Sequence, residues 1–360
     1  MRLRQRDYLL VALGVRLAPL LRRCGELESD LVRARLAAVR IEQPIFITGL
    51  ARSGTTLLLN LLAQIPGIAT HRYRDFPFLW TPIAWNWLQS RIAAKEESVE
   101  RPHRDRIYIT ADSPEAFEEP LWQFFFPHAH SENGNHVLDE TTDASEFEVV
   151  FCDHIRKILL IRGGDRYLSK GNYNVSRIAF LGRLFPDARF VVPIRDPVSH
   201  VHSLVKQHRL FSAYAAQDAR IPKYLMAAGH YEFGPQRRPI NIHRNLGERV
   251  ADAWRRGDEY RGYAALWAGI YGHVAMLVAE RPSLSERIHI VNYDLLCRSP
   301  REQFARILDF ADLDPGAAVL DRLDHIEAPP PSEAELSDDD RRAVESEARF
   351  VAGHYGYLAS

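Results

Sequence analysis

A short apolar run that ends in a glycine-containing loop and continues into a helical pattern constrains the fold most strongly. Residues 44–49 read PIFITG, residues 55–65 read TTLLLNLLAQI, and Pro66-Gly67 follows. The first segment has the length of a buried strand, and the second has the length of a helix that the proline ends. Strand, loop and helix in this order predict an α/β unit whose loop lies at the carboxyl end of its strand, where open sheets bind ligands.

The loop has the outline of a phosphate-binding loop that lacks its lysine. Four residues separate Gly49 from Gly54, as in the G-x-x-x-x-G-K-[ST] loop that binds ATP or GTP with magnesium. Thr55 stands at the lysine position, Thr56 follows it, and Arg52 lies inside the loop. An ordinary glycine-containing turn is the alternative, but the flanking strand and helix favour a phosphate held by backbone amides. Arg52 is a fixed cation suited to an oxyanion without a metal.

The rest of the chain alternates strand and helix patterns. Further strands are expected at 165–170, 188–196 and 287–294. Helices are expected at 145–161, 174–185, 197–208, 261–281 and 299–313, and a surface connection at 328–340 leads into a last helix. The region 211–260 is polar with little periodicity. This alternation predicts a P-loop-like three-layer α/β fold with a central parallel sheet flanked by helices.

We expect one domain over residues 1–360, since this length fits one large domain or two small ones. Residues 71–136 are rich in aromatics, proline and histidine, which indicates an insertion on the acceptor side. Residues 1–43 predict a helical segment packed on the domain, with peripheral membrane contact as the alternative. No run reaches the roughly 18 apolar residues of a membrane span.

Composition narrows the function classes. A formal net charge of -1 gives no global basic field for nucleic acid. The three cysteines, Cys24, Cys152 and Cys297, lie far apart, so neither a disulfide framework nor a zinc site is expected. Sparse cysteines fit a reducing compartment, and the expected location is cytoplasmic. The oligomeric state stays open.

A second candidate anion site lies in FPDARFVVPIRDPVSHVHSL, residues 185–204. Arg195 stands at the carboxyl end of a buried strand, Asp196 is the expected cap of the next helix, and Ser203 lies two turns along it. Arg195 and Ser203 are therefore candidates to bind a second phosphate. The alternative is an ion pair for Arg195 and a surface hydroxyl for Ser203.

Three segments together resemble the sulfotransferases that use 3'-phosphoadenosine 5'-phosphosulfate (PAPS). They are RSGTTLL at 52–58, the segment 185–204, and RIHIVNYDLLCRSPREQFARILDFADL at 287–313. The resemblance extends over about 44–70 and 166–313. It is nearer to the bacterial, carbohydrate and tyrosylprotein branch than to the cytosolic small-molecule branch, which has lysine at the position of Arg52.

The resemblance implies roles for these residues. The 5'-phosphosulfate would be held by Arg52, Ser53, Gly54, Thr55 and Thr56. The 3'-phosphate would be held by Arg195 and Ser203. Tyr293 resembles a residue near the purine, although the basic Arg-Lys-Gly loop of the cytosolic branch is not visible here. Lys170 resembles a second cation, which with Arg52 would stabilise the charge that develops on the bridging oxygen. An ordinary surface lysine is the alternative for Lys170.

The acceptor hydroxyl needs a base. The tyrosylprotein branch has a glutamate six residues after the proline that ends the loop helix, but that position here is Arg72. Our candidates, in order, are Asp75, then Glu118 or Glu119, then His71 or another histidine such as His128 or His130. Structural alternatives are an ion pair for Asp75, a solvated face for the glutamates and plain loop for the last two histidines. An acceptor pocket or the core is expected to hold Trp80, Trp85, Trp87, Trp122, Phe124, Phe125 and Phe126.

The sequence therefore predicts an enzyme that moves a sulfuryl group from PAPS to a hydroxyl or amine. The acceptor would be a small molecule, lipid or glycan, and no metal is expected. One alternative is a P-loop kinase, although Arg195 beside Asp196 disfavours the magnesium site that a kinase needs. The other alternative is an inactive nucleotide-binding protein.

Overall fold

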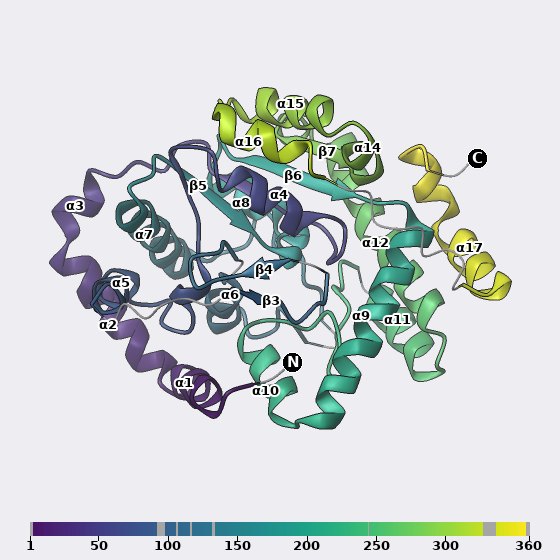
Figure 1. Ribbon diagram of the computed structural model, residues 1–360, viewed down its shortest axis with the longest axis horizontal. Coiled ribbons are helices and arrows are strands. Elements are labelled where there is room, and N and C mark those ends of the chain that lie inside the picture. Colours follow the sequence, from purple (N-terminus) through teal and green to yellow (C-terminus); the bar gives the residue numbers. More distant parts are fainter. Residues whose placement is uncertain are drawn as a thin grey trace.

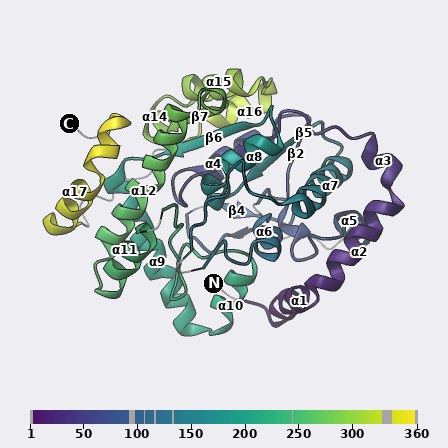
Figure 2. The same ribbon diagram turned by 180° about the vertical axis from the view of Figure 1, so that it is seen from behind.

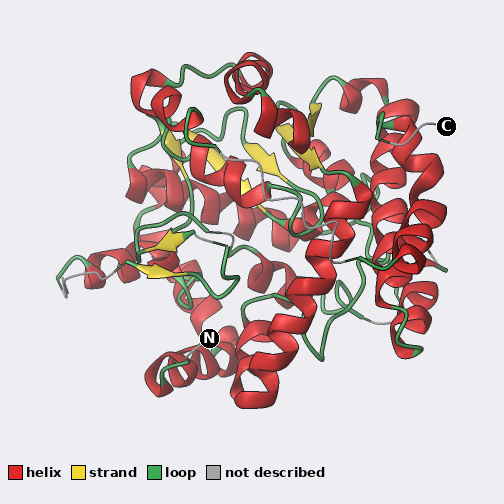
Figure 3. Cartoon of the chain, turned by 45° about the vertical axis from the view of Figure 1, so that its right-hand side comes forward, coloured by secondary structure: helices red, strands yellow, loops and turns green. Residues whose placement is uncertain are grey.

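A five-stranded parallel sheet forms the centre of the computed structural model, which describes residues 3–91, 98–105, 107–115, 117–131, 134–243, 245–326 and 336–357. The strands are β1 (Ile45–Ile47), β2 (Ile68–Ala69), β5 (Arg166–Lys170), β6 (Arg189–Ile194) and β7 (Ile288–Asn292). Their order is β2-β5-β1-β6-β7, and each neighbouring pair runs parallel. Figure 3 shows the short strands surrounded by helices.

Successive residues of β1 face opposite layers, and all three are buried. Phe46 contributes to a core beneath α7 (Ser145–Arg162), α8 (Ile178–Leu184), α9 (Pro197–Gln217) and α12 (Glu259–Glu280). Ile45 and Ile47 contribute to a core with α4 (Thr55–Leu62), α15 (Pro300–Ala311) and α16 (Gly316–Leu323). A parallel sheet covered on both faces confirms the predicted three-layer α/β fold. The position of α15 and α16 above the sheet can be followed in Figure 1.

The remaining elements lie around this sandwich. The N-terminal segment forms α1 (Gln5–Arg16), α2 (Ala18–Leu31) and α3 (Arg33–Ala37). The insertion holds η1 (Tyr73–Asp75), α5 (Pro82–Gln89), β3 (Val99–Glu100), β4 (Tyr108–Ile109) and α6 (Glu119–Phe125). The other elements are η2 (Asn172–Ser176), α10 (Arg220–Ala227), α11 (Leu246–Arg255), α13 (Pro282–Ser285), α14 (Tyr293–Arg298) and α17 (Asp338–His354). Figures 1 and 2 place α1–α3 along one edge of the molecule and α17 at the opposite edge.

Close backbone contacts hold the N-terminal helices against the insertion. A side chain at Gly25 of α2 would place its Cβ 2.4 Å from the carbonyl oxygen of Trp80. Glu28 accepts a hydrogen bond from the backbone amide of Ala84 at 2.7 Å and lies 3.1 Å from Lys157 of α7. The exposed face of these helices carries Leu9, Leu10, Leu13, Val15, Leu20, Leu27 and Leu31.

The region 211–260 differs from the sequence prediction. Helix α9 continues to Gln217, and α10 and α11 follow it. In α11 the buried residues are Leu246, Gly247, Val250 and Ala253, which recur at helical spacing. The helical repeat is hard to recognise in the sequence, because charged residues lie between these positions and few of the buried residues are large and apolar. Residues 328–335 of the predicted surface connection lie outside the described part of the chain.

Strand β7 ends at Asn292, two residues earlier than the predicted strand 287–294. The side chain of Asn292 accepts a hydrogen bond from the backbone amide of Leu295 at 2.9 Å, which caps α14. Tyr293 therefore begins a helix at the carboxyl edge of the sheet instead of ending the strand.

Helix α12 is, within the described ranges, the helix that is long and apolar enough to cross a membrane by length and composition. The sequence analysis predicts a helix at 261–281 but no membrane-spanning segment. Of its most apolar window, 61% is buried inside the protein, where it packs against α9, α11 and α17. A core helix of a folded domain has these properties.

Candidate active site

The loop between β1 and α4 needs glycine at two positions. Gly49 has a φ of 146° and Gly54 a φ of 107°, both in the region that side chains disfavour. A Cβ at Gly54 would lie 2.3 Å from the Cδ2 atom of Tyr293, and a Cβ at Gly49 would lie 3.2 Å from the Pro193 carbonyl oxygen. Arg52 also has a positive φ of 71°. The curled loop leads straight into α4, whose first-turn amides have no partner within the helix and so favour an anion.

Four of the predicted cofactor-binding side chains meet at this loop. The Arg52 Nε donates to Ser203 Oγ at 3.3 Å, which joins the loop to α9. The guanidinium carbon of Arg195 lies 5.4 Å from the centre of the Tyr293 ring. Arg195 is buried, and its Nε has no hydrogen-bond partner within the part of the chain that the structure describes. Asp196 caps α9 by accepting from the Ser199 amide at 2.9 Å, as the sequence predicts.

Burial lowers the pKa of Arg52, and the positive charges of Arg101 and Arg195 lower it further, whereas Asp105 opposes this change. The loop therefore lies in an excess of positive charge that an anionic ligand would relieve. Ser53 and Thr55 are buried within the loop, and Thr56 at the start of α4 accepts a hydrogen bond from the Arg101 Nη1 at 3.3 Å.

An acidic residue that the sequence analysis did not single out lies between two of these arginines. The Oδ2 of Asp105 is 2.6 Å from the Arg52 Nη1, and the Oδ1 accepts from the Arg101 Nε at 2.8 Å. The Arg101 Nη2 also donates to Asp105. Burial alone would raise the pKa of Asp105, but the hydrogen bonds and charges of the two arginines hold it well below its usual range.

Lys170 lies at the end of β5, where its Nζ is 3.2 Å from the Oε1 of Glu115. The Tyr73 hydroxyl donates to the other oxygen of Glu115 at 2.6 Å. Lys170 and Glu115 are both buried. Burial, followed by the neighbouring Glu115, raises the pKa of Tyr73 well above its usual range, while Arg101 opposes the shift. Arg101, which contacts Thr56, also interacts with Glu115 through its charge, and Glu115 is a further candidate base.

His230 is the imidazole whose charge interacts with this pair. Burial lowers its pKa, but the hydrogen bond and charge of Glu232, 3.5 Å away, outweigh burial and raise it above its usual range. Glu115 raises the pKa of His230 as well, and Lys170 lowers it. Glu232 is also fixed by a hydrogen bond from Asn172 at 2.8 Å.

Asp75, the first-ranked base, occupies a structural ion pair instead. The Arg162 Nη2 donates to both of its carboxylate oxygens, at 2.5 and 2.6 Å, and the Arg72 amide donates to Oδ2 at 2.8 Å. His71 stacks on His154, and burial, then the charge of Arg162, lowers the pKa of His71 to about 3. Asp75 therefore makes the ion pair that the sequence analysis gave as the alternative to its role as base.

Glu118 and Glu119 belong to a separate buried network. Glu118 accepts a hydrogen bond from the Tyr167 hydroxyl, and burial raises its pKa. Glu119 binds Arg177 at 2.7 and 2.9 Å and His130 at 2.5 Å. Burial would raise the pKa of Glu119, but Arg177 and His130 hold it below its usual range. Both glutamates are buried, which excludes the solvated face considered as their alternative.

Most of the predicted acceptor aromatics are core residues. Trp122 is fully buried, and its ring packs at a tilt against those of Phe147 and Phe151 of α7. Phe125 and Phe126 pack against the same core, and Trp80 and Phe124 contact each other edge to face. The Trp85 indole donates to the Arg74 carbonyl, whereas Trp87 is 57% exposed. His128 is exposed.

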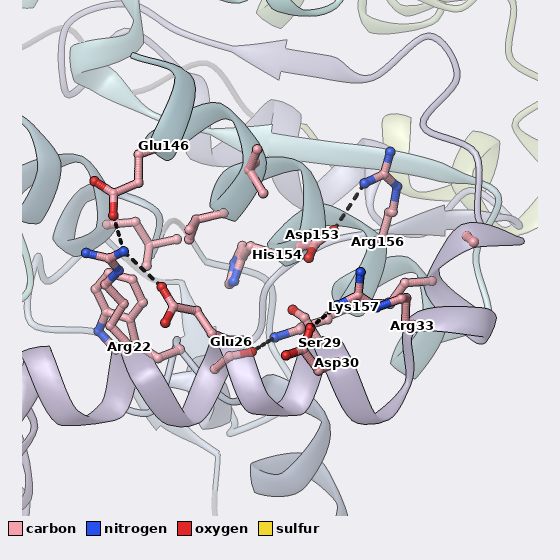
Figure 4. A pocket seen from close by; sticks show the side chains of 17 residues that line it. Arg22, Glu26, Ser29, Asp30, Arg33, Glu146, Asp153, His154, Arg156 and Lys157 are labelled. Carbon is pink, nitrogen blue, oxygen red and sulfur yellow. Dashed lines mark hydrogen bonds and ion pairs between the residues drawn. The ribbon is translucent and has the colours of Figure 1, made fainter.

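A groove of about 720 Å³ lies between α2 and α7, and its lining contains no residue of the loop 49–54 (Figure 4). Its walls carry neutralising pairs, including Arg22 with Glu146 and Asp153 with Arg156. His154, the partner of His71, lies on its wall. The groove therefore lies near the ion pair of Asp75 with Arg162.

Within the described residues there is no group of three or more histidine, cysteine, aspartate or glutamate side chains that could hold a metal ion. The cysteines are free: Cys24 is exposed, Cys152 half-buried and Cys297 buried. The cationic side chains near the loop are those of Arg52, Arg101 and Arg195, which suit an anionic ligand.

A glycine loop at the carboxyl edge of a parallel sheet, with arginines around it, defines a P-loop-like α/β protein with a candidate anion site. The model of the sulfotransferase family matches residues 44–237, which is more than half of the chain. The chain belongs to the sulfotransferase family. Family and fold support an enzyme that transfers sulfate.

Solved structures agree with this fold. Sulfotransferase STF9 from Mycobacterium avium has a TM-score of 0.50 at 16% identity, over 92% of this chain and 82% of that one. Sulfotransferase STF1 from Mycobacterium tuberculosis H37Rv has a TM-score of 0.45 at 17% identity, over 96% and 84% of the two chains. No curated protein sequence matches this chain. At these identities the comparison with STF9 establishes the fold alone.

Proposed function

We propose that the protein transfers a sulfuryl group from PAPS to a hydroxyl, or an amine, of a small-molecule, lipid or glycan acceptor. The observation that carries this proposal is a pair of arginines at the loop: Arg52 is half-buried and donates to Ser203, and Arg195 is buried beside the Tyr293 ring. Two separate cationic positions on one nucleotide site suit a donor with phosphates at both ends of its ribose. The loop also lacks the lysine that a triphosphate site uses.

The residues present fit this donor. The amides of the loop and of the first turn of α4, with Arg52, would hold the 5'-phosphosulfate. Arg195 and Ser203 would hold the 3'-phosphate, and the unpartnered Nε of Arg195 is a donor for it. The Tyr293 ring lies against Gly54 and beside Arg195, where a purine would stack. When bound, PAPS supplies an activated sulfuryl group on its bridging oxygen.

Glu115 is the carboxylate that we assign as the base. Its carboxylate lies between Lys170 and Tyr73, and Arg101 interacts with it through its charge. As the acceptor oxygen bonds to sulfur and the bond from sulfur to the bridging oxygen breaks, Glu115 takes the acceptor proton. Arg52 and Lys170 stabilise the negative charge left on the bridging oxygen.

The first test of this function is the binding of adenosine 3',5'-bisphosphate without metal. We expect calorimetry to give the same dissociation constant with magnesium and with an excess of chelator, because the arginines and amides supply the positive charge. A chelator that abolishes binding would favour the kinase alternative. Bound nucleotide without turnover against any hydroxylated acceptor would favour the inactive nucleotide-binding protein.

The second test separates the two phosphates. Replacing Arg195 by alanine is expected to weaken adenosine 3',5'-bisphosphate by about 10- to 150-fold, since a charge-assisted hydrogen bond contributes about 1.5–3 kcal/mol. Adenosine 5'-monophosphate, which has no 3'-phosphate, should lose little. Competition calorimetry gives both constants. Equal weakening of the two ligands would mean that Arg195 does not contact the 3'-phosphate.

A further inference from the structure

The carboxylate of Asp105 is bound by an arginine of the loop and by a second arginine beside it. It is shared by Arg52, at 2.6 Å, and Arg101, at 2.8 Å, and the Arg101 Nη1 reaches Thr56 Oγ1 at 3.3 Å. The chain segment that supplies Asp105 lies 53 residues beyond Arg52, in the turn between β3 and β4. A carboxylate bound by two guanidiniums carries negative charge and accepts hydrogen bonds as a bound phosphate oxygen pair does.

The fold fixes Arg101 at this place more firmly than it fixes Asp105. Two contacts hold the turn on α9: the Gln207 Nε2 donates to the His103 carbonyl at 3.0 Å, and the Tyr214 hydroxyl donates to the Pro102 carbonyl at 3.2 Å. Arg101, directly before this anchor, is 6% exposed. Asp105 follows Arg104, which is exposed and has a positive φ of 51°. A change of the Asp105 side chain alone would release both arginines.

We propose that Arg101 is a donor-binding arginine for the 5'-phosphosulfate, and that Asp105 holds the place of this group in the unliganded protein. This inference rests on the proposed function. On binding, the donor's 5'-oxygens replace the Asp105 carboxylate between Arg52 and Arg101. Arg101 then faces the donor on one side and the Glu115–Lys170 pair on the other, since Glu115 and Arg101 interact through their charges.

Replacement of the Asp105 carboxylate by the donor predicts opposite effects on ligand affinity for substitutions at Asp105 and at Arg101. Asp105→Asn keeps the shape but removes the competing charge, so 5'-phosphate ligands should bind about 10-fold more tightly. Arg101→Gln removes a charge-assisted contact, so the same ligands should bind about 10- to 150-fold more weakly. Arg104→Gln is the matched control, because Arg104 belongs to the same turn but its guanidinium lies 5.6 Å from the ring centre of Tyr214.

The experiment is calorimetry on the full chain with three ligands: adenosine 3',5'-bisphosphate, adenosine 5'-monophosphate and adenosine 3'-monophosphate. The effects of Arg101→Gln and Asp105→Asn should follow the 5'-phosphate and be absent for the 3'-monophosphate. Arg104→Gln should match the unchanged protein with all three. In the double variant Arg101→Gln/Asp105→Asn, the gain from Asp105→Asn should shrink, because one of the two released cations is gone.

The inference is overturned if Asp105→Asn leaves 5'-phosphate affinity unchanged or weakens it, or if Arg101→Gln behaves like Arg104→Gln. Thermal unfolding of each variant is measured first. If Arg101→Gln does not fold, Asp105→Asn decides the result, since tighter binding that is confined to ligands with a 5'-phosphate requires the lost carboxylate to act at that position. Failure of the unchanged protein to bind adenosine 3',5'-bisphosphate overturns the proposed function instead.

Discussion

Replacing Glu115 by glutamine is expected to slow sulfuryl transfer by about 10²- to 10⁴-fold, with adenosine 3',5'-bisphosphate affinity nearly unchanged. Glutamine keeps the shape and can still bond to Tyr73, but it cannot take the proton from the acceptor oxygen. The loss should therefore appear in kcat, measured with labelled PAPS and an acceptor found by screening hydroxylated compounds.

Two control variants accompany Glu115→Gln. Asp75→Asn weakens the bidentate pair with Arg162, so it should lower the melting temperature while the folded fraction keeps most of its turnover. Glu118→Gln changes the network at Tyr167 and should act in the same way. Near-normal turnover of Glu115→Gln, together with loss of turnover in folded Asp75→Asn or Glu118→Gln, would contradict our assignment of the base.

Lys170→Met is expected to lower kcat by about 10²- to 10³-fold, the usual loss when one group that stabilises transition-state charge is removed. Adenosine 3',5'-bisphosphate lacks the sulfuryl group, so its affinity should change little. Steady-state kinetics and calorimetry separate the two quantities. A large loss of affinity with intact kcat would make Lys170 a binding residue only.

The pair of variants also shows whether Lys170 and Glu115 act together. Their side chains lie 3.2 Å apart and both are buried, so either single change disturbs the other group. If they act as one unit, Glu115→Gln/Lys170→Met should be little slower than the slower single variant. Multiplication of the two losses would indicate independent roles.

The loop could be predicted from the sequence because its determinants are local. Gly49 and Gly54 have positive φ values, and the apolar residues on either side form β1 and α4. Arg195 could also be placed, because a buried apolar run before it and a capping aspartate after it fix the end of β6. Both features depend on residues within a few positions of each other.

The charged centre could not be predicted in the same way. Glu115 meets Lys170 across 55 positions of the chain, and Asp105 meets Arg52 across 53. Nothing near Arg101 or Asp105 in the sequence marks their partners. Glu115 lies three residues before Glu118, so the sequence shows an acidic cluster in this part of the insertion. Choosing the base within that cluster required the position of Lys170 at the edge of the sheet. A count of six residues from Pro66 did not locate the base, because Arg72 stands at that position of the insertion.

Helix α2 packs on the insertion and helps to hold it in place, although α2 lies outside the part of the chain that the family model matches. The family match begins at residue 44, yet Glu28 of α2 is the partner of the buried Lys157 and receives the Ala84 amide. An excised segment that started at residue 44 would lack both the Glu28 carboxylate and the Gly25 carbonyl that bind Lys157, and would expose the surface on which α2 packs. The family match thus covers the loop and most of the strands, whereas packing partners of α7 and of the insertion come from the helices that precede it.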